Sequence, residues 1–448
     1  MSDLLSIGAG GVRAYQSALG TVSENIANAG TAGYARRAAD LKEVVAPGGG
    51  LQAGRVTSGM GVVVAGVSRR ADDYAATSVR TATSDLAKTE GGVRWLDRIE
   101  GALTGDQLGA RVTGFFASAR TLAADPGSIA ARSAMLEAGT AAAGAFRGTG
   151  AALARASADL DASAGEAVDK LNALASGLAE VNGRIGRSAP GSAAAAGLAD
   201  ERDRLLEEMS ALSDIGVGVD AAGRATVRLG GANGPVLVAG QEAGGVTFAR
   251  SETGVATFQL YRAGEAGAFQ PNGGALGAIA DAATRVLDAR TRVDAFANSF
   301  AERVNEVQAQ GRDLDGAPGA AMFSTGDGAA GLTLSLADPR GIAAAGAAGG
   351  ARDASNLAAL EAARTAGGFE AGLTGITAGN AAALQQRRVV AEAQGAIRDN
   401  AAAARDAVSG VDLDTEAVDL IRFQQAYQAS SRVIQVARET FQSILGIN

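Results

Sequence analysis

Both ends of the chain carry a narrow stripe of apolar residues at helical spacing. Near the N-terminus the stripe follows the first and fourth positions of a seven-residue repeat: Leu5, Val12, Tyr15, Leu19, Val22 and Ile26. Near the C-terminus the same spacing joins Leu420, Phe423, Tyr427, Ile434, Ala437, Phe441 and Ile444. A stripe this narrow is typical of a coiled-coil partner and not of a helix on a broad core. The pattern therefore predicts two terminal helices that pair with each other or with the ends of neighbouring chains.

Helical spacing returns along most of the interior, which predicts a bundle of long, narrow helices. The stretches that show it are residues 70–104, 129–160, 168–187, 198–212, 286–307 and 353–410. The tetrapeptide Asp125-Pro126-Gly127-Ser128 interrupts the pattern. Ser128 is placed to cap the helix that follows, since serine is a preferred first residue of a helix.

Between residues 215 and 260 the period changes from helical to alternating. Five short runs alternate in this way: Ile215/Val217/Val219, Val227/Leu229, Val236/Val238, Val246/Phe248 and Phe258/Leu260. Glycine-containing turns separate the runs, so the pattern predicts an antiparallel β unit of about five strands. Two more short strands are predicted, over 62–67 and at 332–336, and residues 46–61 are predicted to be a flexible connector.

These elements predict a mainly α fold with a β insertion, in which paired terminal coiled-coil helices flank a long-helix bundle and an inserted antiparallel β domain. We expect three domains, nested in chain order. A terminal coiled-coil domain takes residues 1–45 and 405–448. A helical bundle domain takes residues 46–214, 275–311 and 351–404. A β-rich outer domain takes residues 215–274, and the pattern leaves open whether 312–350 packs with it.

Composition narrows the class of protein. Apolar residues make up 47% of the chain but aromatic residues only 4%, and there are 63 glycines, which favours slim helices with thin cores. The net charge of −8 argues against a nucleic-acid partner. The chain begins MSDLL, without the basic and apolar segments of a secretory signal, and it has no apolar run long enough to span a membrane. We therefore expect a soluble protein that does not use the ordinary export route.

The residues for common catalytic chemistry are missing. With no cysteine and no histidine, the chain has no disulfide, thiol nucleophile, imidazole base or Cys/His zinc site. The segment Asp313-Leu314-Asp315-Gly316 is similar to the start of a calcium-binding loop, but Ser324 stands where such a loop needs glutamate. We therefore interpret 313–316 as a polar turn and predict no enzyme, no cofactor and no metal site.

The N-terminal motif, however, resembles a known family. Residues 25–34, NIANAGTAGY, resemble the N-terminal signature of flagellar axial proteins, the rod, hook and hook-associated proteins. Two positions depart from it, since the family often has proline at Ala32 and asparagine at Glu24. Residues 416–430 are similar to the matching C-terminal helix of these proteins. The interior segments 115–127, 198–212 and 304–316 resemble the flagellar hook-associated protein 1 family.

This resemblance implies a structural protein of the bacterial flagellum, which joins hook to filament and polymerises through its terminal helices. The implied partners are copies of the chain itself, the hook protein, the next hook-associated junction protein on the filament side and a flagellar export chaperone. Nucleic-acid binding and membrane insertion are not implied. The implied location is extracellular, after export through the flagellar type III apparatus without a cleaved signal. Two alternatives stay open: another axial protein of the hook or distal rod, and an extracellular adhesin-like binding module.

We predict that the assembly interface combines the two stripes with polar residues of the N-terminal motif. Its residues are Leu5, Val12, Tyr15, Leu19, Val22, Asn25, Ile26, Asn28, Gly33, Tyr34, Leu420, Phe423, Tyr427, Ile434, Phe441 and Ile444. The first helix is expected to end near Ala29-Gly30, with Gly30 in the left-handed conformation.

Glycines should make the first helix weak on its own. Gly8, Gly10, Gly11 and Gly20 each disfavour the isolated helix by about 1 kcal/mol relative to alanine. We therefore expect both termini to be mobile in the monomer and to fold when neighbouring subunits supply the rest of the stripe. An ordinary core formed within one chain would use the same spacing, so this alternative stays open.

Overall fold

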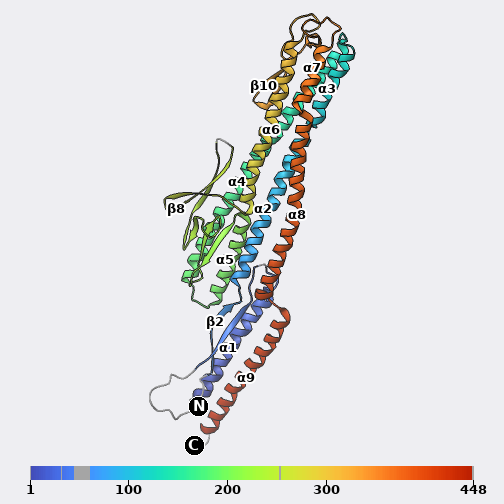
Figure 1. Cartoon of the computed structure of the whole chain (residues 1–448). Coiled ribbons are helices and arrows are strands. Elements are labelled where there is room, and N and C mark those ends of the chain that lie inside the picture. The colour runs from blue at the N-terminus through green and yellow to red at the C-terminus, as the bar shows by residue number, and fades with distance from the viewer. Residues whose placement is uncertain (1, 32, 45–60, 252–253, 446–448) are drawn as a thin grey trace.

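The computed structural model describes residues 2–31, 33–44, 61–251 and 254–445 of the chain. The molecule is long and slender, with most of its helices running along one axis (Figure 1). The first and last helices lie together at one tip, the β-sheets lie against the side of the long helices, and α3 and α7 lie at the opposite tip. This arrangement confirms the predicted mainly α fold with paired terminal helices and a β insertion.

The two terminal helices and a short β-ribbon form one part of the molecule, which we call the terminal unit. Its elements are α1 (Ser2–Ala27), β1 (Arg37–Glu43), β2 (Val62–Arg69) and α9 (Leu413–Leu445). α1 and α9 run antiparallel, because Gly8 lies against Ile434 while Asn25 lies against Glu416. β1 and β2 pair antiparallel beside α1. The strand predicted over 62–67 is confirmed. The predicted connector 46–61 lies outside the described residues, except for Gly61.

The remaining elements form the body. Its helices are α2 (Asp73–Thr104), α3 (Leu108–Ala124), α4 (Ile129–Arg187), α5 (Ala193–Leu212), α6 (Gly274–Gln310), α7 (Ser355–Gly367) and α8 (Phe369–Ser409). The predicted break before α4 is confirmed, since the Ser128 hydroxyl accepts a hydrogen bond from the Ala131 N–H at 3.3 Å. α4 runs unbroken for 59 residues through two stretches that the sequence showed separately. Within 353–410, Gly368 takes a φ of +56° and divides α7 from α8.

The β insertion lies between α5 and α6 as two antiparallel sheets. The first contains β3 (Ile215–Val219), β4 (Ala225–Leu229), β5 (Val236–Ala239) and β6 (Glu242–Ala243), in that order. The second contains β7 (Gly245–Arg250), β8 (Ala256–Arg262) and β9 (Glu265–Phe269). The predicted strands are all present, but the sequence pattern missed β6 and β9. β6 is only two residues long, and β9 has no alternation of large apolar residues for a pattern to detect.

A separate hairpin contains β10 (Phe323–Gly326) and β11 (Gly328–Leu334). It forms its own two-stranded sheet and does not pair with the β insertion in the described part of the chain. Its buried Phe323 and Leu332 belong to a cluster with residues of α3, α4 and α6. The strand predicted at 332–336 is thus present but ends at Leu334, and its packing partners are helices.

The apolar cores of the body and the terminal unit differ in size. At the tip far from the termini, phenylalanine rings from five elements pack together: Phe115, Phe116, Phe146, Phe300, Phe323 and Phe369. A second large cluster joins α4, α5 and α6 to the β insertion. The terminal unit's cluster has just three buried members, Ala18, Val22 and Phe423. Since stability follows buried apolar area, the terminal unit is held far less strongly than the body.

The face of α1 toward α9 is built from small residues. A Cβ added at Gly8 would lie 2.7 Å from Ile434 Cγ1, and one added at Gly11 would lie 2.6 Å from Ser430 Oγ. Val22 and Tyr15 of the predicted stripe pack with Phe423 of α9, whereas Ile26 is 38% exposed. Glycine and alanine on this face allow the two backbones a closer approach than leucine and valine would. Two of the glycines that weaken the isolated helix shape its contact with α9.

Candidate assembly site

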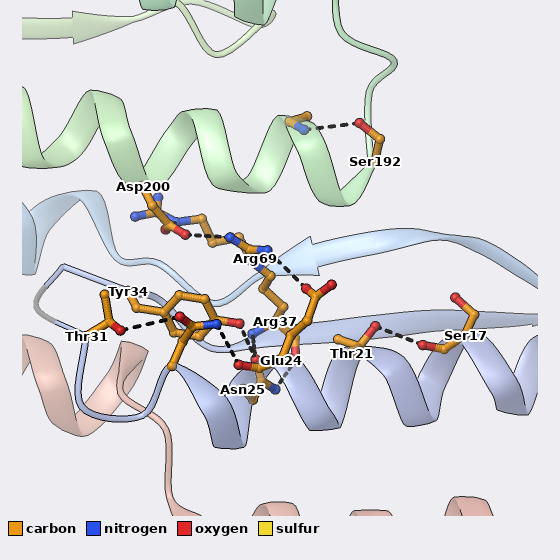
Figure 2. A network of polar contacts seen from close by, with 12 residues as sticks. Ser17, Thr21, Glu24, Asn25, Thr31, Tyr34, Arg37, Arg69, Ser192 and Asp200 are labelled. Atoms are coloured by element: carbon orange, nitrogen blue, oxygen red, sulfur yellow. Dashed lines mark hydrogen bonds and ion pairs between the residues drawn. The ribbon is translucent and has the colours of Figure 1, made fainter.

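A polar network centred on Asn25 joins the end of α1 to the start of α9. Figure 2 shows its part around Asn25, Tyr34 and Arg37. Asn25 is completely buried. Its Nδ2 donates to the Arg37 carbonyl oxygen at 2.8 Å and to Glu416 Oε2 at 3.0 Å. Its Oδ1 accepts from the Arg37 N–H at 3.0 Å and from the Tyr34 hydroxyl at 2.9 Å. An amide side chain offers two donor hydrogens and two acceptor lone pairs, and here all four are used.

The turn after α1 brings Tyr34 back onto Asn25. The Thr31 N–H donates to the Asn28 carbonyl oxygen at 2.9 Å, and the Tyr34 N–H donates to the Thr31 carbonyl oxygen at 3.1 Å. Gly33 has a φ of +80°, a conformation that glycine adopts without strain. The expectation that Gly30 would be the left-handed residue is wrong, since Gly33 and not Gly30 has the positive φ, after the turn that the Asn28–Thr31 hydrogen bond closes.

The remaining polar residues of the motif support this turn. Asn28 Nδ2 donates to the Glu24 carbonyl oxygen at 2.9 Å. This hydrogen bond gives a backbone carbonyl near the end of α1 a side-chain donor. Thr31 Oγ1 donates to Asn28 Oδ1 at 3.4 Å. Burial raises the pKa of Tyr34, although the Arg37 guanidinium over its ring acts in the opposite direction. Tyr34 therefore stays a neutral hydrogen-bond donor to Asn25 at physiological pH.

Glu416 connects this network to α9. Its side chain is fully buried, and its Oε1 accepts from Arg36 Nε at 2.6 Å. Arg36 Nη2 also donates to Asp419 Oδ2 at 3.1 Å, one turn further along α9. Asp412 caps the helix, since its Oδ1 accepts from the Thr415 N–H at 2.8 Å. That N–H lowers the pKa of Asp412. Acidic groups at a helix start also interact favourably with the helix dipole.

Arg37 extends the network to the body. Its Nη1 lies 3.2 Å from Glu24 Oε2 on α1, and its Nη2 lies 2.9 Å from Asp200 Oδ2 on α5. Its Cζ lies 4.9 Å from the centre of the Tyr34 ring. Burial acts to lower the pKa of Arg37, but the hydrogen bond to Asp200 and the neighbouring negative groups outweigh it and raise the pKa. Arg37 is therefore a permanent cation between the two parts of the molecule.

The predicted interface residues fall into three groups by exposure. Val22, Asn25 and Phe423 are buried. The half-buried residues are Leu5, Val12, Tyr15, Leu19, Asn28, Tyr34, Leu420, Tyr427 and Ile434. The exposed residues are Ile26, Gly33 and Phe441, and the side chain of Ile444 lies outside the described ones. Most of the stripe is therefore brought together within one chain, where for example the rings of Tyr15 and Phe423 lie 6.3 Å apart.

Sequence reasoning missed Arg36, Glu416 and Asp200, although Glu416 lies in the segment that carries the C-terminal resemblance. It also missed an apolar row on the outer face of α9. Val418 is 66% exposed, Ile421 56% and Val436 60%. Val418 and Val436 are eighteen residues apart, which is about five helical turns and puts them on the same side. This row leaves α9 with an uncovered apolar face.

Other kinds of site receive no support from the described residues. They contain no group of three or more acidic side chains arranged to hold a metal ion. None of their helices is long and apolar enough to cross a membrane. Asp313 accepts from the N–H groups of Asp315 and Ala317, at 2.9 and 2.8 Å, as a polar turn does.

The elongated fold, the paired terminal helices and the polar motif between them define a protein of the flagellar axial class. Residues 406–447 match the model of the flagellar basal body rod FlgEFG protein C-terminal region. Residues 95–323, just over half of the chain, match the model of the flagellar hook-associated protein FlgK helical domain. The chain belongs to the FlgK family of flagellar hook-associated proteins, which confirms the resemblance of its interior segments.

Individual relatives agree with this assignment. Flagellar hook-associated protein 1 of Escherichia coli is 28% identical over 340 residues, and that of Salmonella typhimurium is 29% identical over 340 residues. Both matches cover 73% of this chain and 60% of the relative. Flagellar hook-associated protein 1 of Bacillus subtilis is 27% identical over 486 residues, covering 96% of this chain and 95% of the relative.

A solved structure shares the fold. It is the flagellar hook junction protein FlgK from Burkholderia pseudomallei, with a TM-score of 0.64 and 14% sequence identity. The match covers 74% of this chain and all of the solved chain.

Proposed function

We propose that this protein is a structural component of the bacterial flagellum that joins hook to filament, and that it polymerises through its terminal helices. Membership of the hook-associated family supports the junction role, as does the likeness to a fold that belongs to a hook junction protein. The role requires no catalysis, and Arg36, Arg37 and Glu416 at the terminal joint make structural ion pairs.

The observation that carries the polymerisation step is the exposed apolar row on α9. Val418 and Ile421 form one pair of neighbours on this face, and Val433 and Val436 form another. Burying such a side chain contributes about 1.5–3 kcal/mol. Because the opposite face of α9 is occupied by α1, we propose that a neighbouring subunit covers the outer row. The half-buried stripe residues at the edge of the pair, such as Val12, would extend the same contact.

The partners follow from a place between hook and filament. We propose copies of the chain itself, the hook protein and the next hook-associated junction protein on the filament side. We also propose an export chaperone and passage through the flagellar type III apparatus to an extracellular position. A hook or distal-rod role is the second candidate, which the rod-type C-terminal match at 406–447 favours. The match of the interior to the hook-associated helical domain favours the junction role over it.

Electron microscopy of flagella from a strain without this protein tests the proposal. We expect hooks without filaments, with filament protein shed into the medium, and restoration of filaments by the intact gene. A strain that builds only a rod, without hooks, would favour the second candidate. Filaments of normal number and attachment would contradict the junction role.

A further inference from the structure

The joint between the terminal unit and the body is polar. The apolar cluster of the terminal unit contains residues of α1, β1 and α9 but none of the body, among the residues that the structure describes. Two chain segments cross the joint, residues 70–72 between β2 and α2 and residues 410–412 between α8 and α9. Polar contacts therefore contribute strongly to the orientation of the two parts.

Two arginines from the ribbon converge on one carboxylate of the body. Arg37, the first residue of β1, reaches Asp200 Oδ2 at 2.9 Å, and Arg69, the last residue of β2, reaches Asp200 Oδ1 at 2.6 Å. The two arginines are paired in the ribbon register, so they leave it side by side. Figure 2 shows both side chains between the ribbon and α5. All three side chains are shielded from solvent, with exposures of 12 to 14%.

Arg69 also reaches a second carboxylate of α5. Arg69 Nη2 lies 2.7 Å from Asp203 Oδ2, one turn further along α5. Asp203 is held in turn by Arg202, whose Nη1 donates to the Gly223 carbonyl oxygen at 2.7 Å. This chain of contacts connects the ribbon to α5 and to the turn that precedes β4. Shielded ion pairs with several hydrogen bonds fix geometry better than exposed pairs do.

Among the described residues, two backbone hydrogen bonds also cross the joint. The Val67 N–H donates to the Gly191 carbonyl oxygen at 2.6 Å, and the Arg36 N–H donates to the Ser409 carbonyl oxygen at 2.8 Å. A single hydrogen bond fixes a point but allows rotation about it. The two arginines on Asp200 instead hold both strands of the ribbon to one side chain of α5.

We propose that Asp200 is a clamp that sets the angle between the terminal unit and the body. Neutralising it detaches Arg37 from the body, while Arg37 keeps Glu24 and Arg69 keeps Asp203, so no cation is left buried and alone. The variant therefore frees the joint without unfolding its parts. The consequence rests on the proposed function: the clamp presents the body at a fixed inclination to the helices that polymerise.

The distance between labels on the two sides of the joint tests the clamp in the full-length monomer. The chain has no cysteine, so Glu90→Cys on α2 and Lys42→Cys on β1, both at exposed positions, place two spin labels uniquely. Pulsed electron spin resonance gives the distribution of distances between them. We expect a single narrow distribution in the unaltered background. With Asp200→Asn we expect it to shift and broaden, while the thermal unfolding of the body stays the same.

Glu201→Gln is the matched control, because Glu201 is the next residue of α5 and forms an exposed pair with Arg184 inside the body. It should leave the distribution unchanged. Arg69→Gln removes the other arm of the clamp and should also broaden the distribution. It replaces Asp200→Asn in the test if that variant lowers protein yield. The clamp is refuted if Asp200→Asn and Arg69→Gln leave the distribution narrow, or if Glu201→Gln broadens it as much. Either result would leave the junction role untouched, since that role is measured on filaments.

Discussion

Asn25 and Glu416 lie 391 positions apart in the chain, yet the Asn25 amide donates to the Glu416 carboxylate at 3.0 Å, and both side chains are completely buried. This contact explains why the N-terminal motif and the start of the last helix belong together. Asn25 supplies both donors and acceptors, Tyr34 completes its acceptor side, and Arg36 neutralises the buried carboxylate. The motif that resembles the flagellar axial signature is also the part that holds the two ends of the chain to each other.

Replacing Asn25 should separate the terminal helices. Asn25→Ala leaves the Arg37 carbonyl and N–H and the Glu416 carboxylate without this partner, at a cost of about 1–3 kcal/mol for each buried group left unsatisfied. Asn25→Asp should destabilise the contact more at neutral pH, because a carboxylate oxygen would then face the Arg37 carbonyl oxygen and the Glu416 carboxylate, which are both acceptors. This loss of stability should shrink as the pH falls and one of the carboxyl groups takes up a proton. Hydrogen exchange of the α9 amides checks both effects. Equal protection in Asn25→Asp and the unaltered chain would contradict the network.

The glycines of α1 should respond differently to substitution. Gly8→Leu and Gly11→Leu should disrupt the α1–α9 contact, since even a Cβ at these positions meets Ile434 or Ser430 at less than van der Waals distance. Gly20→Ala is the matched control, because nothing lies within 4 Å of the added Cβ, and it should stabilise α1 by about 1 kcal/mol. Circular dichroism melting of the full-length protein measures all three. The packing is wrong if Gly8→Leu and Gly20→Ala change the melting curve alike.

The cap of α9 should depend on pH through Asp412. Its pKa is lowered in the folded protein, mainly by the Thr415 N–H, from an ordinary value of 3.8. The stabilising contribution is therefore fully present above that ordinary value and is lost as the pH falls through the lowered one. Asp412→Asn should keep a hydrogen bond to Thr415 but lose this dependence. Exchange rates of the first α9 amides between pH 5 and pH 2 provide the comparison, after correction for intrinsic exchange. Identical profiles for both proteins would exclude this role of Asp412.

The terminal unit should open more readily than the body. Its apolar cluster buries three residues, whereas each cluster of the body buries a much larger set. Local stability follows such differences, so we expect the amides of residues 5–26 to exchange with solvent well before those of α4 and α6 in dilute monomer. Protection in assembled flagella should be higher. Equal protection of α1 and α4 in the monomer would contradict conditional folding of the termini.

The sequence predicted the elements well where local pattern decides them. The break at Ser128 was visible because serine, proline and glycine have fixed roles at helix ends, and the alternation from Ile215 to Leu260 marked five strands correctly. The close approach of α1 to α9 was not predictable from large apolar residues, because it occurs at Gly8 and Gly11. Arg36, Glu416 and Asp200 were missed because their roles exist only once distant segments meet.

The central claim is that the outer row of α9 binds a neighbouring subunit at the hook–filament junction. The most direct test complements the deletion strain with Val418→Asp/Val436→Asp, beside Val219→Asp in the β insertion as a matched exposed-valine control. Electron microscopy then counts filaments on hooks, while circular dichroism of the purified variants and their presence in the medium establish folding and export. We predict bare hooks with the double variant and normal filaments with Val219→Asp. Normal filaments with both variants would contradict the account.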